Sequence, residues 1–271
     1  MLNHAWGSSL LKILTYLATL LLVVMVFWIV GFIIIQGFGF LNQALFNESV
    51  PLIVTTLMVV GLALLIALPL GIFSAIYLQI YTNNGRFVKA MRFSIDSLNG
   101  VPSIIFGLFA LSFFVYYLGL HRSILTAALI MSIVVLPLII KNTEEAIKTI
   151  NVDQIQGSLA LGASKFTTIN RVILPYCING IINGVILAIG KIVGETAAIM
   201  FVIGSANAIP KSFFDPGSTL ATKLYLIIQE PTYSANGIGS AYGIAFILLV
   251  IVILLNLLVK LVNYSFKKRR H

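Results

Sequence analysis

The chain alternates long apolar blocks with short polar segments. No charged residue occurs between Lys12 and Glu48, between Glu48 and Arg86, or between Asp96 and Arg122. A helix needs about 20 apolar residues to cross a hydrocarbon layer of about 30 Å, and each block is long enough. Strict two-residue alternation, the signature of a barrel strand, is absent, so the pattern favours helices. It predicts six transmembrane helices, at about 11–38, 51–80, 96–120, 123–140, 176–203 and 242–262.

Composition agrees with this pattern. Apolar residues make up 59% of the chain and charged residues 9%, against about 25% charged in soluble domains. A soluble core of 271 residues does not hide so many apolar positions. We therefore expect an all-α polytopic membrane protein in which residues 1–271 form a single transmembrane domain. The first apolar block is too long for a signal-peptide core and no small-residue cleavage site follows it, so we expect it to be retained.

Basic residues predict the orientation. Thirteen of them lie on the side that holds both termini and the segments 82–94 and 141–174: Lys12, Arg86, Lys89, Arg92, Lys141, Lys148, Lys165, Arg171, Lys260, Lys267, Lys268, Arg269 and Arg270. Three lie on the other side: Arg122, Lys211 and Lys223. Positive charge accumulates on cytoplasmic loops, so we expect both termini in the cytoplasm of a bacterial cell and residues 205–241 outside. The basic cluster at the end of the last span serves orientation and lipid contact, which removes the argument for nucleic-acid binding.

The sequence offers little for enzymatic chemistry. Its three histidines, His4, His121 and His271, all lie outside the apolar spans, and Cys177 is the single cysteine. Neither a catalytic constellation nor a metal site can be assembled from them. The string 184–191 resembles a phosphate-binding loop, but it has wrong spacing and lies within an apolar helix. We therefore expect no catalytic residue, no metal and no cofactor bound by this chain.

The polar segment 141–175 contains a helix-turn-helix pattern. Ile155 and Leu159 mark one face of a first short helix, and Gly162 accepts the backbone angles of a sharp turn. Ser164 is placed to cap a second helix. An ordinary amphipathic surface loop is the alternative to a docking segment.

This segment resembles the cytoplasmic EAA loop of ABC importer permeases, in which a glycine follows a small-residue helix and an Ile-x-Leu-Pro ending comes later. Gly162 matches the glycine and 172–175 the ending, whereas Gln156 stands in the acidic first position. The resemblance implies that the loop docks on an ATPase subunit and passes its motion to the membrane helices. The coupling residues it implies are Gln156, Gly157, Ser158, Ala160, Gly162, Ala163 and Lys165.

Two opposite charges, Lys191 and Glu195, lie deep in the apolar block 176–203. An unpaired charge at a helix centre opposes insertion by roughly 2.5–3.5 kcal/mol. The spacing of four residues predicts that the two side chains share a helix face and are close enough to pair. They mark either a substrate path or a self-neutralising structural pair.

A second resemblance covers roughly residues 55–230. Lys191 to Ala197 is similar to the Arg-x-x-Gly-Glu-Thr-Ala string of phosphate ABC transporter permeases, with lysine in place of arginine. Lysine keeps the charge but loses the planar fork that grips phosphate. Residues 99–107 resemble a Gly-Val-Pro-Ser-Ile segment of the same family, and 214–220 resemble the Phe-Asp-Pro string of its PstA-type subunits. The substrate-path residues we expect are Lys191, Glu195, Thr196, Asn99 and Ser103.

Three smaller expectations concern surface residues. Asp96 is four positions after Arg92, which allows a pair on one helix, although an exposed carboxylate at a helix start is the simpler interpretation. Glu144, Glu145 and Lys148 read as a solvated helix face. Residues 219–230 predict a short amphipathic helix, which either lies at the membrane interface or covers the outer end of the pathway.

The resemblance implies the type I ABC importer permease fold and a PstA-type permease of a phosphate importer. The implied partners are a PstC-like permease, two copies of an ATPase that binds and hydrolyses the ATP, and an extracytoplasmic phosphate-binding protein. Two alternatives stay open. A permease for another oxyanion, such as molybdate or sulfate, would share the coupling loop. A proton-coupled secondary transporter would use Lys191 and Glu195 as a relay but has no use for that loop.

Overall fold

A computed structural model describes residues 3–82, 85–234 and 237–268, and every regular element within these ranges is a helix. The all-α prediction is therefore confirmed. In chain order the α-helices are α1 (Asn3–Phe38), α2 (Gln43–Ile76), α3 (Arg86–Gly100), α4 (Ser103–Ala110), α5 (Ile124–Lys148), α6 (Val152–Ala160), α7 (Lys165–Thr168), α8 (Leu174–Gly194), α9 (Ala197–Ile203), α10 (Leu220–Gln229) and α11 (Ile238–Lys268). The π-helices η1 (Tyr77–Tyr81), η2 (Leu111–Tyr117) and η3 (Ile169–Ile173) continue α2, α4 and α7, and η4 (Pro231–Tyr233) is a 3₁₀ turn.

Five helical stretches among the described residues are long and apolar enough to cross a membrane. They are Leu11–Phe38, Gln43–Tyr81, Ile124–Lys148, Lys165–Gly194 and Ile238–Tyr264. Five of the six predicted spans overlap these stretches, and the remaining one, 96–120, falls on a bent helix pair. The protein is thus a multi-pass membrane protein with up to six spans.

The prediction of one continuous helix at 96–120 is wrong. Here α3 ends at Gly100, and α4 with η2 follows at an angle of 100°. Val101 has an extended backbone (φ −73°, ψ 128°) because the ring of Pro102 disfavours the helical conformation in the preceding residue. The uncharged run gave no sign of this break, because hydropathy does not report backbone geometry.

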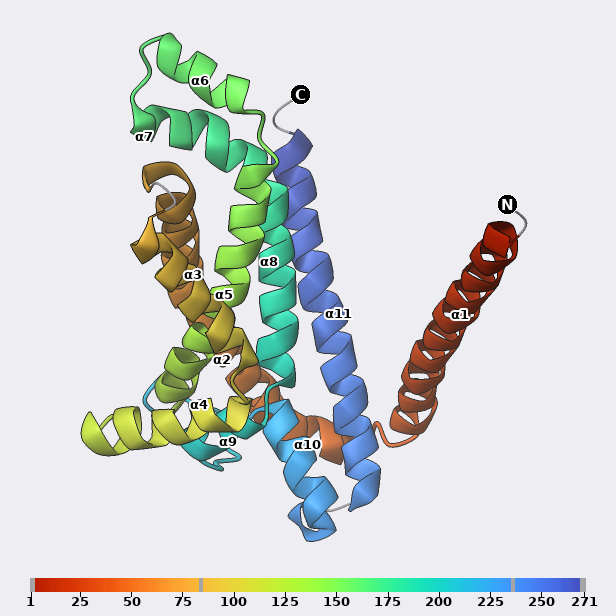
Figure 1. Ribbon diagram of the computed structural model, residues 1–271. Coiled ribbons are helices and arrows are strands. Elements are labelled where there is room, and N and C mark those ends of the chain that lie inside the picture. The colour runs from red at the N-terminus through yellow and green to blue at the C-terminus, as the bar shows by residue number, and fades with distance from the viewer. Residues whose placement is uncertain (1–2, 83–84, 235–236, 269–271) are drawn as a thin grey trace.

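The predicted span 176–203 is also interrupted. α8 ends at Gly194, Glu195 is extended (φ −76°, ψ 127°), and the short helix α9 follows. The two short helices after the breaks, α4 and α9, pack against each other at the lower end of the bundle (Figure 1). Gly107 permits this contact, because a Cβ at that position would lie 2.9 Å from the Cα of Ala198.

The centre of the bundle is formed by α2, α5 and α8. Alanines and β-branched residues fill it, and Ala63, Ala67, Ala127 and Ala188 are fully buried. The approach of α5 to α8 is especially close at Gly180, where an added Cβ would collide with Ala146. Small residues at such crossings give dispersion contacts that longer side chains would prevent.

Helix α1 diverges from this bundle (Figure 1). It packs on α11 near its C-terminal end, where the rings of Phe32 and Tyr242 lie 5.8 Å apart and those of Phe38 and Phe246 lie 6.4 Å apart. No residue of the most apolar window of α1 is buried inside the described chain. An arm of this kind leaves a long apolar face for lipid or another subunit.

The helix predicted at 219–230 is confirmed as α10, which spans Leu220–Gln229. Leu220 and Ile227 are fully buried, and the helix packs mainly on α11 and α2. The Lys223 ammonium lies 3.1 Å from a carboxylate oxygen of Glu48, which ties α10 to the start of α2. α10 is therefore built into the helix bundle and covers its lower end.

The loop before α10 is anchored by backbone hydrogen bonds. The amides of Ile124 and Leu125 at the start of α5 donate to the carbonyls of Asp215 (3.1 Å) and Phe213 (2.8 Å). Asp215 in turn accepts from the amides of Lys211 and Ser212 through its carboxylate. Asp215 of the Phe-Asp-Pro string and the neighbouring Phe213 thus satisfy two amides at the start of α5.

Candidate functional site

The segment after α5 folds as a hairpin of α6, a tight turn, and α7 continued by η3. Gly162 occupies the turn with φ +84°, a conformation that favours glycine. The amides of Gly162 and Ala163 donate back to the carbonyls of Leu159 (3.0 Å) and Ser158 (3.2 Å), which closes the C-terminus of α6. The predicted helix–turn–helix and its glycine are confirmed.

Side-chain hydroxyls stabilise this hairpin, residues 152–173, which we call the coupling hairpin after its predicted role. The hydroxyl of Ser164 accepts the amide of Thr167 at 3.1 Å, so Ser164 is the N-cap, as predicted. The hydroxyls of Ser158 and Thr168 lie 3.0 Å apart and join the two arms. The hairpin is therefore an ordered element with its own hydrogen bonds.

Two large apolar side chains of the coupling hairpin are exposed. Leu161 at its tip is 91% exposed and Phe166 is 70% exposed. All seven expected coupling residues lie on this hairpin: Gln156, Gly157, Ser158, Ala160, Gly162, Ala163 and Lys165. Exposed apolar side chains on an ordered polar element are typical of a protein interaction surface. Whether an ATPase docks there stays a prediction.

A cleft of about 290 Å³ separates the coupling hairpin from the end of α2. Gln79 and Ile80 of η1 form one wall, and Ile155, Leu159 and Lys165 belong to the other. The Lys165 ammonium lies 5.5 Å from the ring centre of Tyr81, within the range of a cation–π contact. The hairpin thus meets the membrane helices at η1.

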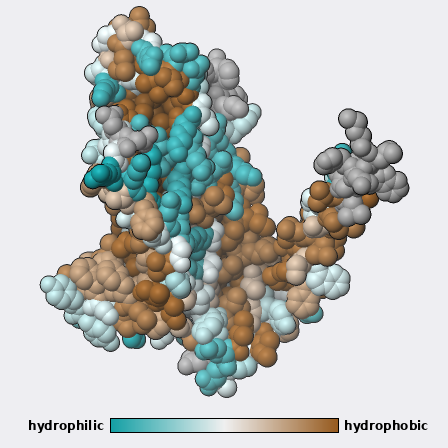
Figure 2. All heavy atoms as spheres, viewed as in Figure 1, coloured by the Kyte–Doolittle hydropathy of each residue, from teal (hydrophilic) through white to brown (hydrophobic). Residues whose placement is uncertain are grey.

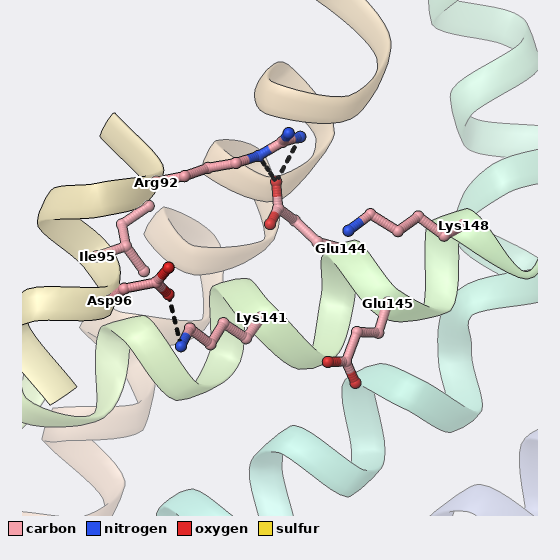
Figure 3. A pocket seen from close by; sticks show the side chains of 7 residues that line it. All are labelled: Arg92, Ile95, Asp96, Lys141, Glu144, Glu145 and Lys148. Carbon is pink, nitrogen blue, oxygen red and sulfur yellow. Dashed lines mark hydrogen bonds and ion pairs between the residues drawn. The ribbon is translucent and has the colours of Figure 1, made fainter. Parts of the chain in front are cut away.

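A cluster of charged residues lies between α3 and α5 (Figure 3). Arg92 reaches across to Glu144, with 3.3 Å from both Nε and Nη2 to the same carboxylate oxygen. Asp96 accepts the Lys141 ammonium at 2.6 Å. Both pairs connect different helices: Asp96, whose side chain is 60% exposed, lies within α3 and pairs with Lys141 of α5. The reason is that α3 lies along α5 and offers each charge an opposite charge there.

The expectation that Glu144 belongs to a solvated face is wrong. The side chain of Glu144 is 9% exposed, whereas Glu145 and Lys148 are exposed as expected. Besides Arg92, Glu144 accepts a hydrogen bond from the Gln79 amide at 3.3 Å. Hydrophilic residues gather over this upper half of the molecule around α3 and α5 (Figure 2).

Lys191 and Glu195 do not pair. The Lys191 ammonium donates to the carbonyl of Val134 in α5 at 3.4 Å, three residues before Pro137. Glu195 lies beyond the last residue of α8, and its carboxylate accepts the amide of Ala198 at 3.3 Å at the start of α9. The four-residue rule fails because the helix that it assumes ends at Gly194.

The expected substrate-path residues lie at the two helix breaks. Asn99 is the next-to-last residue of α3 and Ser103 begins α4, on either side of the first break. Lys191, Glu195 and Thr196 lie at the second break. The packing of α4 on α9 brings the two breaks to the same end of the bundle. Contact of these side chains with a substrate stays a prediction.

Sequence reasoning missed the link from Gln79 through Glu144 to Arg92. Its members lie 52 and 65 positions apart in the chain, so no local spacing reveals them. One signal was present: Glu144 falls in the stripe Ile140, Thr143, Ile147, which has the three- and four-residue spacing of a buried helix face. A carboxylate on such a stripe needs a partner.

The family described as binding-protein-dependent transport system inner membrane component matches residues 67–271. The chain is 32% identical over 216 residues to the phosphate transport system permease protein PstA 1 of Mycobacterium tuberculosis strain CDC 1551, covering 79% of this chain and 70% of that protein. It is 32% identical over 237 residues to the probable ABC transporter permease protein YqgI of Bacillus subtilis, covering 81% and 76%. A PstA from Haemophilus influenzae is 26% identical over 264 residues, covering 94% and 93%.

Solved structures give the same fold. The MetNI methionine ABC transporter superposes with a TM-score of 0.60 at 17% identity, covering 80% of this chain and 94% of that chain. A bacterial ABC transporter that imports alginate superposes with a TM-score of 0.61 at 18% identity, covering 90% and 95%. These likenesses confirm the predicted fold of an ABC importer permease. The chain therefore belongs to the family of binding-protein-dependent transport system inner membrane components.

Proposed function

We propose that this chain is the PstA-type permease subunit of an ATP-driven phosphate importer. Relatives that cover most of the chain carry the name of phosphate permeases. The observation that supports the substrate most directly is Lys191, a cation in an apolar transmembrane helix next to the break at Glu195.

The surroundings of Lys191 suit an anion. Its ammonium has no ion pair with another described residue, and it donates to a neutral backbone carbonyl. A charge in an apolar span costs on the order of 2.5–3.5 kcal/mol, and such charges normally face a cavity or a substrate path. A passing phosphate would supply the missing negative charge. The lysine holds it as a point charge, where an arginine would bind two oxygens.

The two helix breaks also support a phosphate path near Lys191. Interrupted transmembrane helices point the positive ends of their dipoles at anionic substrates in several transporters. α4 begins without a side-chain cap, whereas at the start of α9 the carboxylate of Glu195 accepts the amide of Ala198. Asn99, Ser103 and Thr196 add neutral polar groups at these breaks. Together with Lys191 they form the proposed polar path.

The chain does no hydrolysis in this proposal and binds no cofactor. Its coupling hairpin docks on an ATPase that binds ATP, and the exposed Leu161 and Phe166 provide the apolar contact. A second, PstC-like permease completes the path, and the unpacked face of α1 is available to it. Two ATPase copies serve the two permeases, and an extracytoplasmic binding protein delivers phosphate. Both termini and the hairpin lie in the cytoplasm of a bacterial cell, following the basic residues.

Uptake of radiolabelled phosphate tests the proposal. A host that lacks its own phosphate permeases expresses the chain with its partners, and sulfate and molybdate are added as competitors. We expect uptake that needs ATP and that unlabelled phosphate alone suppresses. Suppression by molybdate or sulfate instead would identify another oxyanion. Uptake that survives inactivation of the ATPase but collapses with the proton gradient would identify a secondary transporter.

A further inference from the structure

The π-helix η1 lies between the coupling hairpin and the charge cluster. On one side Gln79 and Ile80 line the cleft shared with Ile155 and Leu159 of α6. On the other side the Gln79 amide donates to Glu144 at 3.3 Å. Gln79 lines the first cleft, and its hydrogen bond to Glu144, which lines the charged cleft between α3 and α5, joins the two sites.

Three separate elements converge on Glu144. Its oxygen Oε1 accepts from Gln79 of η1 and from both Nε and Nη2 of Arg92 of α3, while Glu144 itself belongs to α5. Arg92 also reaches the carbonyl of Leu78 in η1, at 3.4 Å. We call this network of hydrogen bonds among Gln79, Leu78, Arg92 and Glu144 the Glu144 node. A displacement of η1 moves hydrogen-bond partners of both Glu144 and Arg92. Figure 3 shows Arg92 and Glu144 directed at each other across the gap between their helices.

Burial separates this node from the neighbouring ion pair. The side chains of Arg92 and Glu144 are 31% and 9% exposed, whereas those of Lys141 and Asp96 are 41% and 60% exposed. An exposed pair contributes little because water and salt screen it. A buried carboxylate is costly without its partners, so Glu144 keeps them when the helices move. The buried Glu144 node is thus the less solvent-screened of these two connections between α3 and α5.

We propose that Gln79, Glu144 and Arg92 are positioning residues that transmit movement of the coupling hairpin to α3 and the helix break beyond it. The proposal rests on the proposed coupling to an ATPase, but not on phosphate as the substrate. The hairpin displaces η1 across their shared cleft. η1 then displaces Arg92 through Gln79, Glu144 and the Leu78 carbonyl. Because α3 leads into the break at Val101 and Pro102, its movement changes the path residues Asn99 and Ser103.

Spin-label distances in the assembled transporter test this route. In a Cys177→Ala background, the pair Asn170→Cys and Tyr264→Cys reports on the hairpin. The pair Ser97→Cys and Tyr264→Cys reports on α3; all three positions are exposed. Distances are compared without nucleotide and with vanadate-trapped ADP. In the parent we expect both distances to change.

The relay variants are Glu144→Gln and Gln79→Leu, which keep side-chain size. We expect the hairpin distance to change as in the parent, while the change at α3 falls by about half or more. Uptake falls about tenfold at similar ATP hydrolysis, within the range of typical coupling energies. Lys141→Met, which breaks the exposed pair on the same helices, is the matched control and leaves both distance changes intact.

A double-mutant cycle distinguishes loss of the relay from a general loss of stability. Adding Arg92→Gln to Glu144→Gln should reduce coupling little further, because both changes open the same link. An undiminished response of α3 in both relay variants would overturn the relay, as would a parent whose α3 ignores nucleotide. A transporter that responds at α3 but imports another anion would overturn the proposed substrate and leave the relay standing.

Discussion

Lys191 and Glu195 are four positions apart and yet bind different partners. Lys191 donates to the Val134 carbonyl of α5, at 3.4 Å, and Glu195 accepts the Ala198 amide at the start of α9, at 3.3 Å. The end of α8 at Gly194 separates them. A self-neutralising pair therefore does not account for the lysine, and the two residues have separable roles.

We expect Glu195 to stabilise the start of α9, where its carboxylate accepts the Ala198 amide. Glu195→Gln keeps an oxygen that accepts the Ala198 amide, so we expect near-normal stability and uptake. Glu195→Ala removes the cap and should lower the free energy of unfolding by about 1 kcal/mol, the usual loss for a helix cap. Thermal unfolding of the purified protein, with phosphate uptake alongside, measures both. Equal loss in the two variants would indicate that the charge matters.

Glu195→Gln also serves as a test of pairing. If Lys191 formed an ion pair with Glu195, a neutral residue at position 195 would restore the uptake that is lost when Lys191 is made neutral. The observed partners predict no rescue. Recovery of uptake in the double variant Lys191→Met/Glu195→Gln would show that the two charges meet in another state of the transporter.

The turn of the coupling hairpin depends on Gly162. A side chain at φ +84° is strained by roughly 1–2 kcal/mol. Gly162→Val should leave the chain in the membrane but uncouple uptake from ATP hydrolysis or release the ATPase subunit. Gly61→Ala is the control, because that glycine lies within helix α2 and has open space around its Cβ position. Co-purification of the ATPase and the ratio of uptake to hydrolysis are the measurements. Normal values for Gly162→Val would refute the role of the turn.

Orientation is tested by cysteine labelling in intact cells. In the Cys177→Ala background, an impermeant thiol reagent should label Ile209→Cys, in the exposed outer loop, and spare Ala160→Cys on the hairpin. After the cells are opened, both should react. The basic residues predict this result because they concentrate on the hairpin side. Labelling of Ala160→Cys from outside would reverse the topology.

Local signals in the sequence predicted local structure well. Gly162 and Ser164 act on their immediate neighbours, so the turn and the cap of the hairpin follow from residue type and spacing alone. The long apolar helices follow from hydropathy for the same reason. The helix break at Pro102 was foreseeable in principle, since a proline restricts the residue before it. The charge-free run around it concealed the boundary.

Contacts between residues far apart in the chain were not predicted from the sequence. The partner of Glu144 is Arg92, 52 positions away, and only the packing of α3 on α5 brings them together. The separation of Lys191 from Glu195 depended on where α8 ends, and helix boundaries are set by tertiary contacts as much as by propensity. The hydrogen bond from Gln79 to Glu144 was not predicted because these residues are also far apart in the chain.

The central claim is that the charge of Lys191 attracts a transported phosphate. Lys191→Gln keeps a hydrogen-bond donor that can serve the Val134 carbonyl but removes the charge, and Lys191→Arg keeps the charge. A lost hydrogen bond to a charged group costs roughly 1.5–3 kcal/mol, so initial uptake of labelled phosphate should fall roughly 10- to 100-fold in Lys191→Gln. Lys191→Arg should retain uptake, with both variants at normal levels in the membrane. Near-normal uptake by Lys191→Gln would contradict the account.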